Sequence, residues 1–472
     1  MENVNVGANS LAYIALVSWP LVALYLYSKL PVTQATIWTI LGGFLLLPVG
    51  FDIKFKLIPA FTKYSVSSLA ALLGCVIYTR RLPRFFQSFG LVEVMLLIVI
   101  FGPFVTAMLN GDPIQVGRTF LPGVGAHDAG AAAIAEAIDI LPFVIARQYL
   151  RSAEDNAQIL RIMVIAGLAY SIPVLFELRM SPQLNIWVYG YMPDSFLQEE
   201  RGSGYRAIVF VGLGLTVAIF SMTTAVAAAS LWRTRTSVGR FPLGAITAYL
   251  SLVVVLCKSL GSLVYCAAAV PLVRWGSPRL QVRVASVLVI VALAYPMLRA
   301  TGLFPTTTMV EVARAVSQDR GNSLNLRFSQ EDQLLAHALE RPLFGWGRYG
   351  RNRLFNGWQG GSSSITDGFW IIILGVYGLA GFAATFGLIA LPVFRAARAL
   401  KFAETIRERE HLAALAVINA VTMIDQLPNA SFSNWNWLLV GALLGRAEQL
   451  RTARSQMVGL QHPRPLAGRL SS

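Results

Sequence analysis

The segment from Arg341 to Arg353, RPLFGWGRYGRNR, contains the glycine spacing GxGxxG together with four arginines and three aromatic residues. In a dinucleotide-binding loop these glycines turn a buried strand tightly into a helix, whose amino end holds a pyrophosphate. Here the preceding residues, LLAHALERPLF, form a helical pattern that ends at Pro342, and no strand–helix–strand unit surrounds them. The spacing therefore does not indicate a nucleotide site.

The same loop is nevertheless suited to phosphate and sugar. Guanidinium groups bind phosphate oxygens in pairs, and aromatic faces cover sugar rings. A solvated loop near lipid headgroups is the alternative, because Trp, Tyr and Arg are common there. The side chains concerned are Arg341, Arg348, Arg351, Arg353, Trp346, Tyr349 and Phe355.

Several other chemistries lack their motifs. The sequence has no GxxxxGK[ST] loop, no His/Cys cluster with metal-ligand spacing and no DxD pair. These are the usual signals for nucleoside triphosphate binding, metal sites and metal-bound nucleotide sugars. We therefore expect no metal site and no cofactor, and ATP-driven transport and nucleotide-sugar transfer are disfavoured.

Two acids flank the loop. The upstream segment NSLNLRFSQEDQLLAHALERP predicts an amphipathic helix, with Arg327 and Glu331 four residues apart on its polar face. Asp367 opens the next apolar run, where the helix dipole favours an acid, so capping is an alternative to a chemical role. The expected apolar face comprises Leu324, Phe328, Leu335 and Leu339.

Membrane helices must position these residues. The chain of 472 residues is 55% hydrophobic and 13% charged, with a mean hydropathy of +0.59, whereas a soluble protein carries about a quarter charged residues. Apolar runs of about 17–20 residues recur throughout. They predict an all-α polytopic membrane protein with 12–14 transmembrane helices, at 11–28, 36–51, 65–79, 90–109, 130–149, 158–177, 205–232, 241–257, 260–275, 282–300, 366–393, 411–428 and 433–446.

The charge distribution predicts an orientation. The formal charge of +15 would suggest nucleic acid in a soluble protein, but membrane proteins collect Lys and Arg in cytoplasmic loops. We therefore expect no nucleic-acid partner. Lys54, Lys56 and Lys63 oppose this orientation, and a missed helix near them would change the count. The basic clusters that define the cytoplasmic side are at 79–84, 147–151, 233–240, 274–283 and 395–401, together with the tail from Arg446.

This topology divides the chain into four parts. Residues 1–300 carry the first ten helices and two shorter periplasmic loops, and residues 301–365 form a large periplasmic loop that contains short helices. Residues 366–446 carry the last helices, and residues 447–472 form a basic cytoplasmic tail. The large loop holds seven arginines against five acids. Long loops escape the positive-inside rule, which therefore neither forbids these arginines nor explains them.

The order of three segments resembles a known family. An Arg opens a helix, the helix ends in PLFGWG, and after a loop the next span begins with a short polar motif and continues as GxxGLxG. This resembles the carboxy-terminal signature of the O-antigen ligase and polymerase superfamily, the bacterial lipid-linked glycan polymerases and ligases. RGSGYRAIVF at 201–210 is similar to the Arg-Gly start of a middle span in that family, and LCKSLGSLVYCAAAVPLVRW at 256–275 to its SRG span. The similarity covers residues 201–394.

The resemblance implies an activity. In this family the donor is a glycan on undecaprenyl pyrophosphate, displayed at the outer face of the inner membrane, and the acceptor of a polymerase is another lipid-linked repeat unit. A sugar hydroxyl attacks the anomeric carbon and the lipid pyrophosphate leaves. The chain is thus expected to polymerise exopolysaccharide or O-antigen repeats in the bacterial inner membrane, surrounded by membrane lipid, with a chain-length regulator as a further partner to consider.

The implied reaction assigns roles to the candidate residues. Charge on the leaving pyrophosphate must be neutralised, and the attacking hydroxyl needs a base. Asp367 is the first candidate base and Glu331 the second. For each basic residue the structural alternative is an ion pair with a nearby acid, such as Arg327 with Glu331. The candidates for pyrophosphate binding are Arg201, Arg206, Lys258 and Arg327, with Arg348 and Arg351 as weaker ones.

One departure favours a polymerase over a ligase. Ligases of this family carry a His at the start of the span after the large loop, and this chain has Thr366-Asp367-Gly368 there. His337 lies about 30 residues upstream and is more often structural on such a helix. A ligase that transfers finished glycan to another acceptor is the first alternative.

Five acids within apolar runs leave a transporter open as the second alternative, because intramembrane acids are commonly functional. A transporter of glycolipid or solute would be built from two related halves with interrupted helices. No convincing pair of interrupted segments is visible. The acids are Glu93, Glu136, Asp139, Glu177 and Asp425.

Overall fold

The computed structural model describes residues 7–54, 60–86, 89–193, 199–201, 204–355, 364 and 367–461. Within these residues, helices make up nearly all regular structure, and seven of them are long and apolar enough to cross a membrane. The chain is therefore an all-α polytopic membrane protein. The seven helices are α1 (Ser10–Lys29), α4 (Leu91–Met108), α5 (Ala126–Tyr149), α6 (Ala153–Met180), α8 (Gly214–Thr234), α11 (Pro278–Ala300) and α14 (Phe369–Ala399), which continues into the short helix η2 (Leu400–Phe402).

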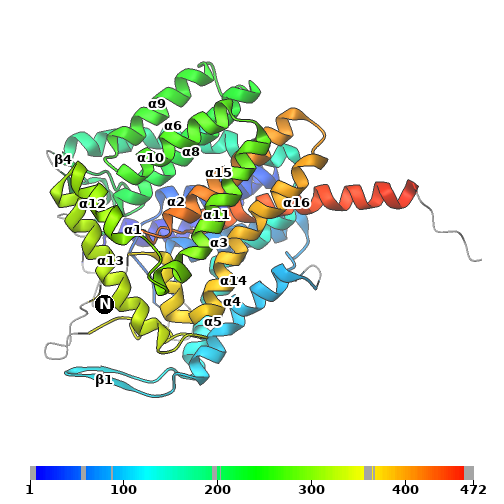
Figure 1. Cartoon of the computed structure of the whole chain (residues 1–472). Helices are drawn as coiled ribbons and strands as arrows, with labels where there is room; N and C mark the ends of the chain where they lie inside the picture. The colour runs from blue at the N-terminus through cyan, green and yellow to red at the C-terminus, as the bar shows by residue number, and fades with distance from the viewer. Residues whose placement is uncertain are drawn as a thin grey trace, which may run out of the picture.

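Six further helices complete the bundle, so that each of the thirteen predicted spans coincides with a helix among the described residues. Four of the six are shorter apolar helices. The last, α16, continues beyond the bundle, and its end projects to the right in Figure 1. The six are α2 (Val32–Leu46), α3 (Lys63–Thr79), α9 (Leu243–Leu256), α10 (Leu260–Trp275), α15 (Ile406–Asp425) and α16 (Asn434–Gln461).

Successive helices alternate in direction, so their connections lie on two faces. One face carries the basic clusters, as the sequence predicts: Arg147 and Arg395 both pair with Glu448, and Arg233 pairs with Glu410 at 2.7 Å. We call it the basic face. The other carries the long connections after α4, α6 and α11, and lies to the left in Figure 1; we call it the loop face.

Lys63 lies on the loop face but does not disturb the topology. Its side chain is buried, and its ammonium group donates to the carbonyl oxygen of Phe210 at 2.9 Å. The described residues between α2 and α3 contain no further helix, although Lys56 lies outside them. The additional helix considered for this region is therefore not seen in the described part of the chain.

The start of α8 differs from the sequence prediction. The span was expected from residue 205, but α8 begins at Gly214. The preceding backbone forms a turn, closed by the amides of Val211 and Gly212 on the carbonyl oxygen of Ile208. The buried Glu177 carboxylate accepts the amides of Ile208 and Val209 at 2.8 and 2.7 Å. The side chain of Glu199 accepts the first amide of the helix, from Gly214, at 3.1 Å.

The largest connection contains two helices, α12 (Thr306–Val316) and α13 (Gln318–Leu339), which pack together at the loop face (Figure 1). The predicted amphipathic helix is thus present, although it starts at Gln318. Its faces differ from the prediction, because Glu331 is buried beside Phe328 and Leu335 while Leu339 is exposed. Smaller loop-face elements are β1 (Ile114–Val116), β2 (Thr119–Leu121), α7 (Leu184–Tyr189), β3 (Glu200–Arg201) and β4 (Gly204–Tyr205).

A break in α14 joins the two halves of the family-like signature. Gly378 has φ +65°, a left-handed conformation that favours glycine, and it interrupts the helical hydrogen bonding. The backbone N–H and C=O groups left unpaired at the break form hydrogen bonds with the PLFGWG segment, which lies alongside it. The hydrogen bonds are Trp346 N to Gly375 O (2.8 Å), Gly347 N to Val376 O (2.9 Å), Leu379 N to Pro342 O (2.7 Å) and Ala380 N to Leu343 O (3.0 Å).

Candidate functional site

A cavity of about 620 Å³ lies at the loop face. Its walls are mainly apolar and come from α10, α11, α12, α13, the start of α14 and the end of α15. Three charged side chains line it: Arg327, Glu331 and Asp367. We call it the first cavity. The structure therefore brings both candidate bases and one candidate pyrophosphate ligand to a single apolar chamber.

Arg327 and Asp367 form an ion pair across the first cavity, with 3.3 Å between Nε and Oδ2. The side chains are 36% and 41% exposed, so both remain open to a ligand. Arg327 also donates to the carbonyl oxygen of Pro428 at 3.5 Å, which links α13 to the connection between α15 and α16. The alternative pairing of Arg327 with Glu331 is not observed.

Asp367 does not cap a helix by its side chain. The N-cap residue of α14 is Gly368, and no side-chain capping hydrogen bond is formed there. The Asp367 carboxylate instead faces Arg327. A half-exposed carboxylate beside a guanidinium can accept a hydroxyl proton from a ligand in the cavity.

Glu331 occupies a more enclosed position. Its carboxylate accepts a hydrogen bond from the Tyr295 hydroxyl at 2.8 Å and lies 3.4 Å from Arg299 Nε. Arg299 is itself held by Asp332 at 2.8 Å and by the carbonyl oxygen of Phe328 at 3.0 Å. Burial raises the pKa of Glu331 above the usual range for a carboxyl group. Because its partners Tyr295 and Arg299 both belong to α11, Glu331 is suited to a structural role that holds α13 against α11 in the cavity wall.

This raised pKa makes a prediction for stability. A carboxyl group with a higher pKa in the folded state binds more protons there, so its contribution is fully present at pH below the unfolded pKa and is lost as pH rises through the folded pKa. We expect the melting temperature of Glu331→Gln, relative to wild type, to improve as pH rises from 4 to 8. Paired thermal melts in lipid nanodiscs check this. A difference that is constant with pH would contradict it.

Two basic candidates lie beside the first cavity. Lys258 occupies the exposed turn between α9 and α10, two residues before Leu260 of the cavity wall, and adopts a left-handed φ of 54°. Its Nζ lies against Gly204, where an added Cβ would be 2.6 Å away. Arg206 donates to the Lys258 carbonyl oxygen at 3.3 Å. Within the described residues the Lys258 ammonium group has no hydrogen bond or ion pair.

For Arg201 the structure describes the backbone but not the side chain. Its backbone lies in β3, where it pairs with Gly204 of β4. This hairpin also carries the glycine that contacts Lys258. The backbone of Arg201 therefore lies in the same region as Arg206 and Lys258, while its side chain falls outside the described part of the structure.

Arg348 belongs to a different cavity. It donates to Glu136 at 2.7 Å and to the Tyr377 hydroxyl at 2.8 Å, and Tyr377 donates to the same carboxylate at 2.8 Å. Asp139 lines the cavity beside them. The structure thus does not bring Arg348 to the first cavity, and the two acids around it disfavour a pyrophosphate ligand.

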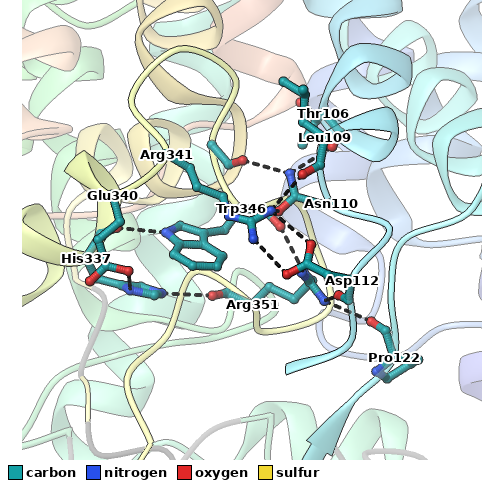
Figure 2. A network of polar contacts seen from close by, with 11 residues as sticks. Thr106, Leu109, Asn110, Asp112, Pro122, His337, Glu340, Arg341, Trp346 and Arg351 are labelled. Atoms are coloured by element: carbon teal, nitrogen blue, oxygen red, sulfur yellow. Dashed lines mark hydrogen bonds and ion pairs between the residues drawn. The ribbon is translucent and has the colours of Figure 1, made fainter. Parts of the chain in front are cut away.

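Arg351 has a structural position. It is 1% exposed and donates to the backbone carbonyls of Asp112, Pro122 and Trp346 at 2.9, 3.0 and 3.2 Å. Figure 2 shows it inside a polar network in which Arg341 also holds Asp112, with 2.8 Å between Nη2 and Oδ2. Arg351 is therefore not available to bind pyrophosphate in the first cavity.

His337 joins the same network. Its ring stacks on Trp346 with 4.4 Å between centroids, and Nε2 contacts the carbonyl oxygen of Arg351 at 3.1 Å (Figure 2). The arginine- and aromatic-rich loop thus fastens α13 to the segment after α4. Its glycines serve the backbone, since Gly345 and Gly347 have φ values of 68° and 83°.

Most intramembrane acids have structural partners. Glu93 pairs with Arg147 at 3.0 Å, Glu177 holds the backbone before α8, and Asp425 accepts from Asn429 at 2.9 Å and from Ser431 at 3.2 Å. Glu136 is paired with Arg348. Of the five acids, only Asp139 has no hydrogen bond or ion pair within the described residues.

The sequence prediction missed Arg299 and Tyr295, which position Glu331 from α11. Both residues lie in the last turns of an apolar run, where an arginine reads as an interfacial anchor. An arginine at the loop-face end of a span, close to a second arginine-rich segment, is the only signal that could have indicated Arg299. Tyr295 carries no signal, because aromatic residues are common at such ends.

No protein-family model matches this chain, and no curated protein matches its sequence significantly. The class that the fold defines is the polytopic all-α membrane protein, and the site adds an apolar cavity with charged residues at the loop face.

Proposed function

We propose that the protein is a glycan polymerase that joins lipid-linked oligosaccharide repeats in the bacterial inner membrane, with the loop face toward the periplasm. The observation that carries this proposal is the first cavity, which combines apolar walls with the Arg327–Asp367 pair. A lipid pyrophosphate is amphipathic in the same way, because an isoprenoid chain needs apolar walls and a pyrophosphate needs cations. A cavity for a soluble sugar would not need such walls.

The proposed reaction assigns one task to each group. The acceptor hydroxyl oxygen forms a bond to the anomeric carbon of the donor while the bond from that carbon to the pyrophosphate oxygen breaks. Asp367 accepts the hydroxyl proton. Arg327 stabilises the negative charge that develops on the leaving pyrophosphate, and Lys258 and Arg206 extend this positive region along the cavity rim.

Two features of the site support this assignment. Lys258 has no ion pair in the described residues, so its charge is available to an incoming anion. Arg327 is paired with the same carboxylate that is proposed as the base. Pyrophosphate binding can therefore draw Arg327 away and leave Asp367 free to accept a proton.

Deletion of the gene in the bacterium that encodes it tests the function. A polymerase mutant should keep single repeat units at the cell surface and lose long chains, as seen by gel electrophoresis of extracted glycans. Long chains that accumulate on undecaprenyl pyrophosphate would indicate a ligase instead. Loss of even single-unit products at the outer face would indicate a transporter.

A further inference from the structure

A second cavity, of about 260 Å³, lies on the opposite side of the first turns of α14. Asp367 and Ile371 line the first cavity, whereas Phe369, Ile372 and Ile373 line the second. One helical segment therefore separates the two chambers. The polar side chains that line the second cavity include Glu136 and Asp139 of α5, Arg348 of the loop, Tyr377 of α14, Tyr64 of α3, and Ser433 and Asn434 at the start of α16.

Two donors of this cavity are engaged with one acceptor, Glu136, while two further acceptors, on Asp139 and Asn434, are not engaged within the described residues. Arg348 and the Tyr377 hydroxyl both donate to Glu136. Asp139 is exposed and has no hydrogen bond or ion pair in the described residues. Asn434 is 3% exposed, its amide nitrogen donates to Ser67 at 2.8 Å, and its Oδ1 has no partner in the described part of the structure. A guest that carries hydrogen-bond donors can satisfy both of these acceptors.

The formal charge of the lining disfavours an anionic guest. Glu136 and Asp139 supply two negative charges, and Arg348 supplies one positive charge, which leaves one negative charge. Like charges brought together repel each other, and they do so more strongly in a partly enclosed cavity than in bulk water. A phosphate or pyrophosphate is disfavoured here, in contrast to the rim of the first cavity.

The remaining walls suit a sugar ring. Phe369, Phe432 and Trp437 line the second cavity beside Tyr64. Phe369 and Phe432 stack with 5.7 Å between centroids, and Trp437 meets Phe432 edge-on. Aromatic faces cover the apolar face of a sugar, while carboxylate and amide oxygens accept its hydroxyl protons. The volume of about 260 Å³ is just below that of pockets for drug-sized ligands, which begin at roughly 300 Å³, so the cavity is sized for a single ring.

We propose that the second cavity binds one neutral or amino sugar residue, with Asp139 and Asn434 accepting hydrogen bonds from its hydroxyl groups. The inference rests on the proposed function for the identity of the parent molecule, the lipid-linked glycan, but not for sugar binding itself. A sugar bound in the second cavity is separated from Asp367 by the first turns of α14. The second cavity would thus bind the glycan beside the reacting centre. It would select sugars that carry no negative charge.

Binding to the purified full chain in lipid nanodiscs tests the proposal. The probes are the methyl glycosides of glucose, galactose, mannose, N-acetylglucosamine and glucosamine, with sodium chloride and sodium pyrophosphate as contrasts, followed by the change in melting temperature. We expect at least one glycoside to stabilise the wild-type protein saturably. Asp139→Asn should weaken that binding about tenfold, since one of the two carboxyl oxygens that accept hydroxyl protons is replaced by an amide donor. Asp319→Asn, the same change at an exposed position in the first turn of α13 that does not line the cavity, should leave glycoside binding unchanged.

Three results would overturn the proposal: no glycoside binds, only sodium ions or pyrophosphate stabilise the protein, or Asp139→Asn and Asp319→Asn weaken glycoside binding equally. A different result would contradict the proposed function alone. If gene deletion leaves long chains intact while Asp139-dependent glycoside binding persists, the protein is not the polymerase but the sugar site stands.

Discussion

Arg327→Ala is expected to abolish long glycan chains, with a fall of about 100-fold or more in the rate of repeat addition. Removal of one preorganised group that stabilises transition-state charge has effects of this size. Arg327 is the only arginine that lines the first cavity in the described residues, and it holds Asp367 at 3.3 Å. The measurement is chain-length distribution in cells that carry the variant at wild-type protein level.

Two companion variants make this result specific. Arg327→Lys keeps the charge but loses the forked geometry of the guanidinium group, so it should restore only part of the rate. Arg320→Ala removes an exposed arginine in the first turn of the same helix, away from the cavity lining, and should leave chain length unchanged. Full-length chains from Arg327→Ala would exclude the pyrophosphate role of this residue.

Gly378→Ala is expected to be the most destabilising small substitution in α14, by about 2–5 kcal/mol from backbone strain and overpacking together. Gly378 has φ +65°, and an added Cβ would lie 2.4 Å from the carbonyl carbon of Leu343. The backbone pairing between PLFGWG and the break in α14 would be forced apart. Thermal melts in nanodiscs measure the loss.

Gly102→Ala supplies the matched control. Gly102 lies inside α4 with ordinary helical φ, and no atom lies within 4 Å of an added Cβ. This variant should be neutral or more stable by up to about 1 kcal/mol. Equal melting temperatures for the two variants would show that the break in α14 does not require glycine.

The helical bundle was predictable because hydropathy is a local property. Each apolar run must satisfy its own backbone hydrogen bonds in a membrane, so each predicted span became a helix. The start of α8 was not predictable in this way, because the apolar backbone before Gly214 forms a turn that the carboxylates of Glu177 and Glu199 hold by its amides. Those partners are distant in sequence, and hydropathy does not report them.

The candidate site was predictable in part. The sequence placed Arg327 and Asp367 on the same side of the membrane and named both as candidates, and the structure pairs them, whereas the pairing considered from the sequence was Arg327 with Glu331. Arg348 and Arg351 lie outside the first cavity, which the sequence could not show because exposure cannot be read from a loop sequence. Arg351 is buried against three backbone carbonyls, and Arg348 is neutralised by Glu136, 212 positions away.

The glycines of the PLFGWG segment and of α14 are needed for the same reason, because the two backbones lie in contact. Gly345 and Gly378 face each other, so that an added Cβ on Gly345 would lie 2.6 Å from the Gly378 amide nitrogen. Two motifs that appear separate in the sequence are thus the two sides of one backbone junction. This junction sets the position of α13 against α14, and therefore the distance between Arg327 and Asp367.

Reconstitution tests the central claim most directly. The purified protein in proteoliposomes is supplied with an undecaprenyl-pyrophosphate-linked repeat unit as sole substrate, without ATP or nucleotide sugar. The account predicts a ladder of longer lipid-linked glycans, with one undecaprenyl pyrophosphate released for each bond formed, and a strong loss of both products with Asp367→Asn. Movement of the repeat unit across the bilayer without chain growth or pyrophosphate release would contradict it.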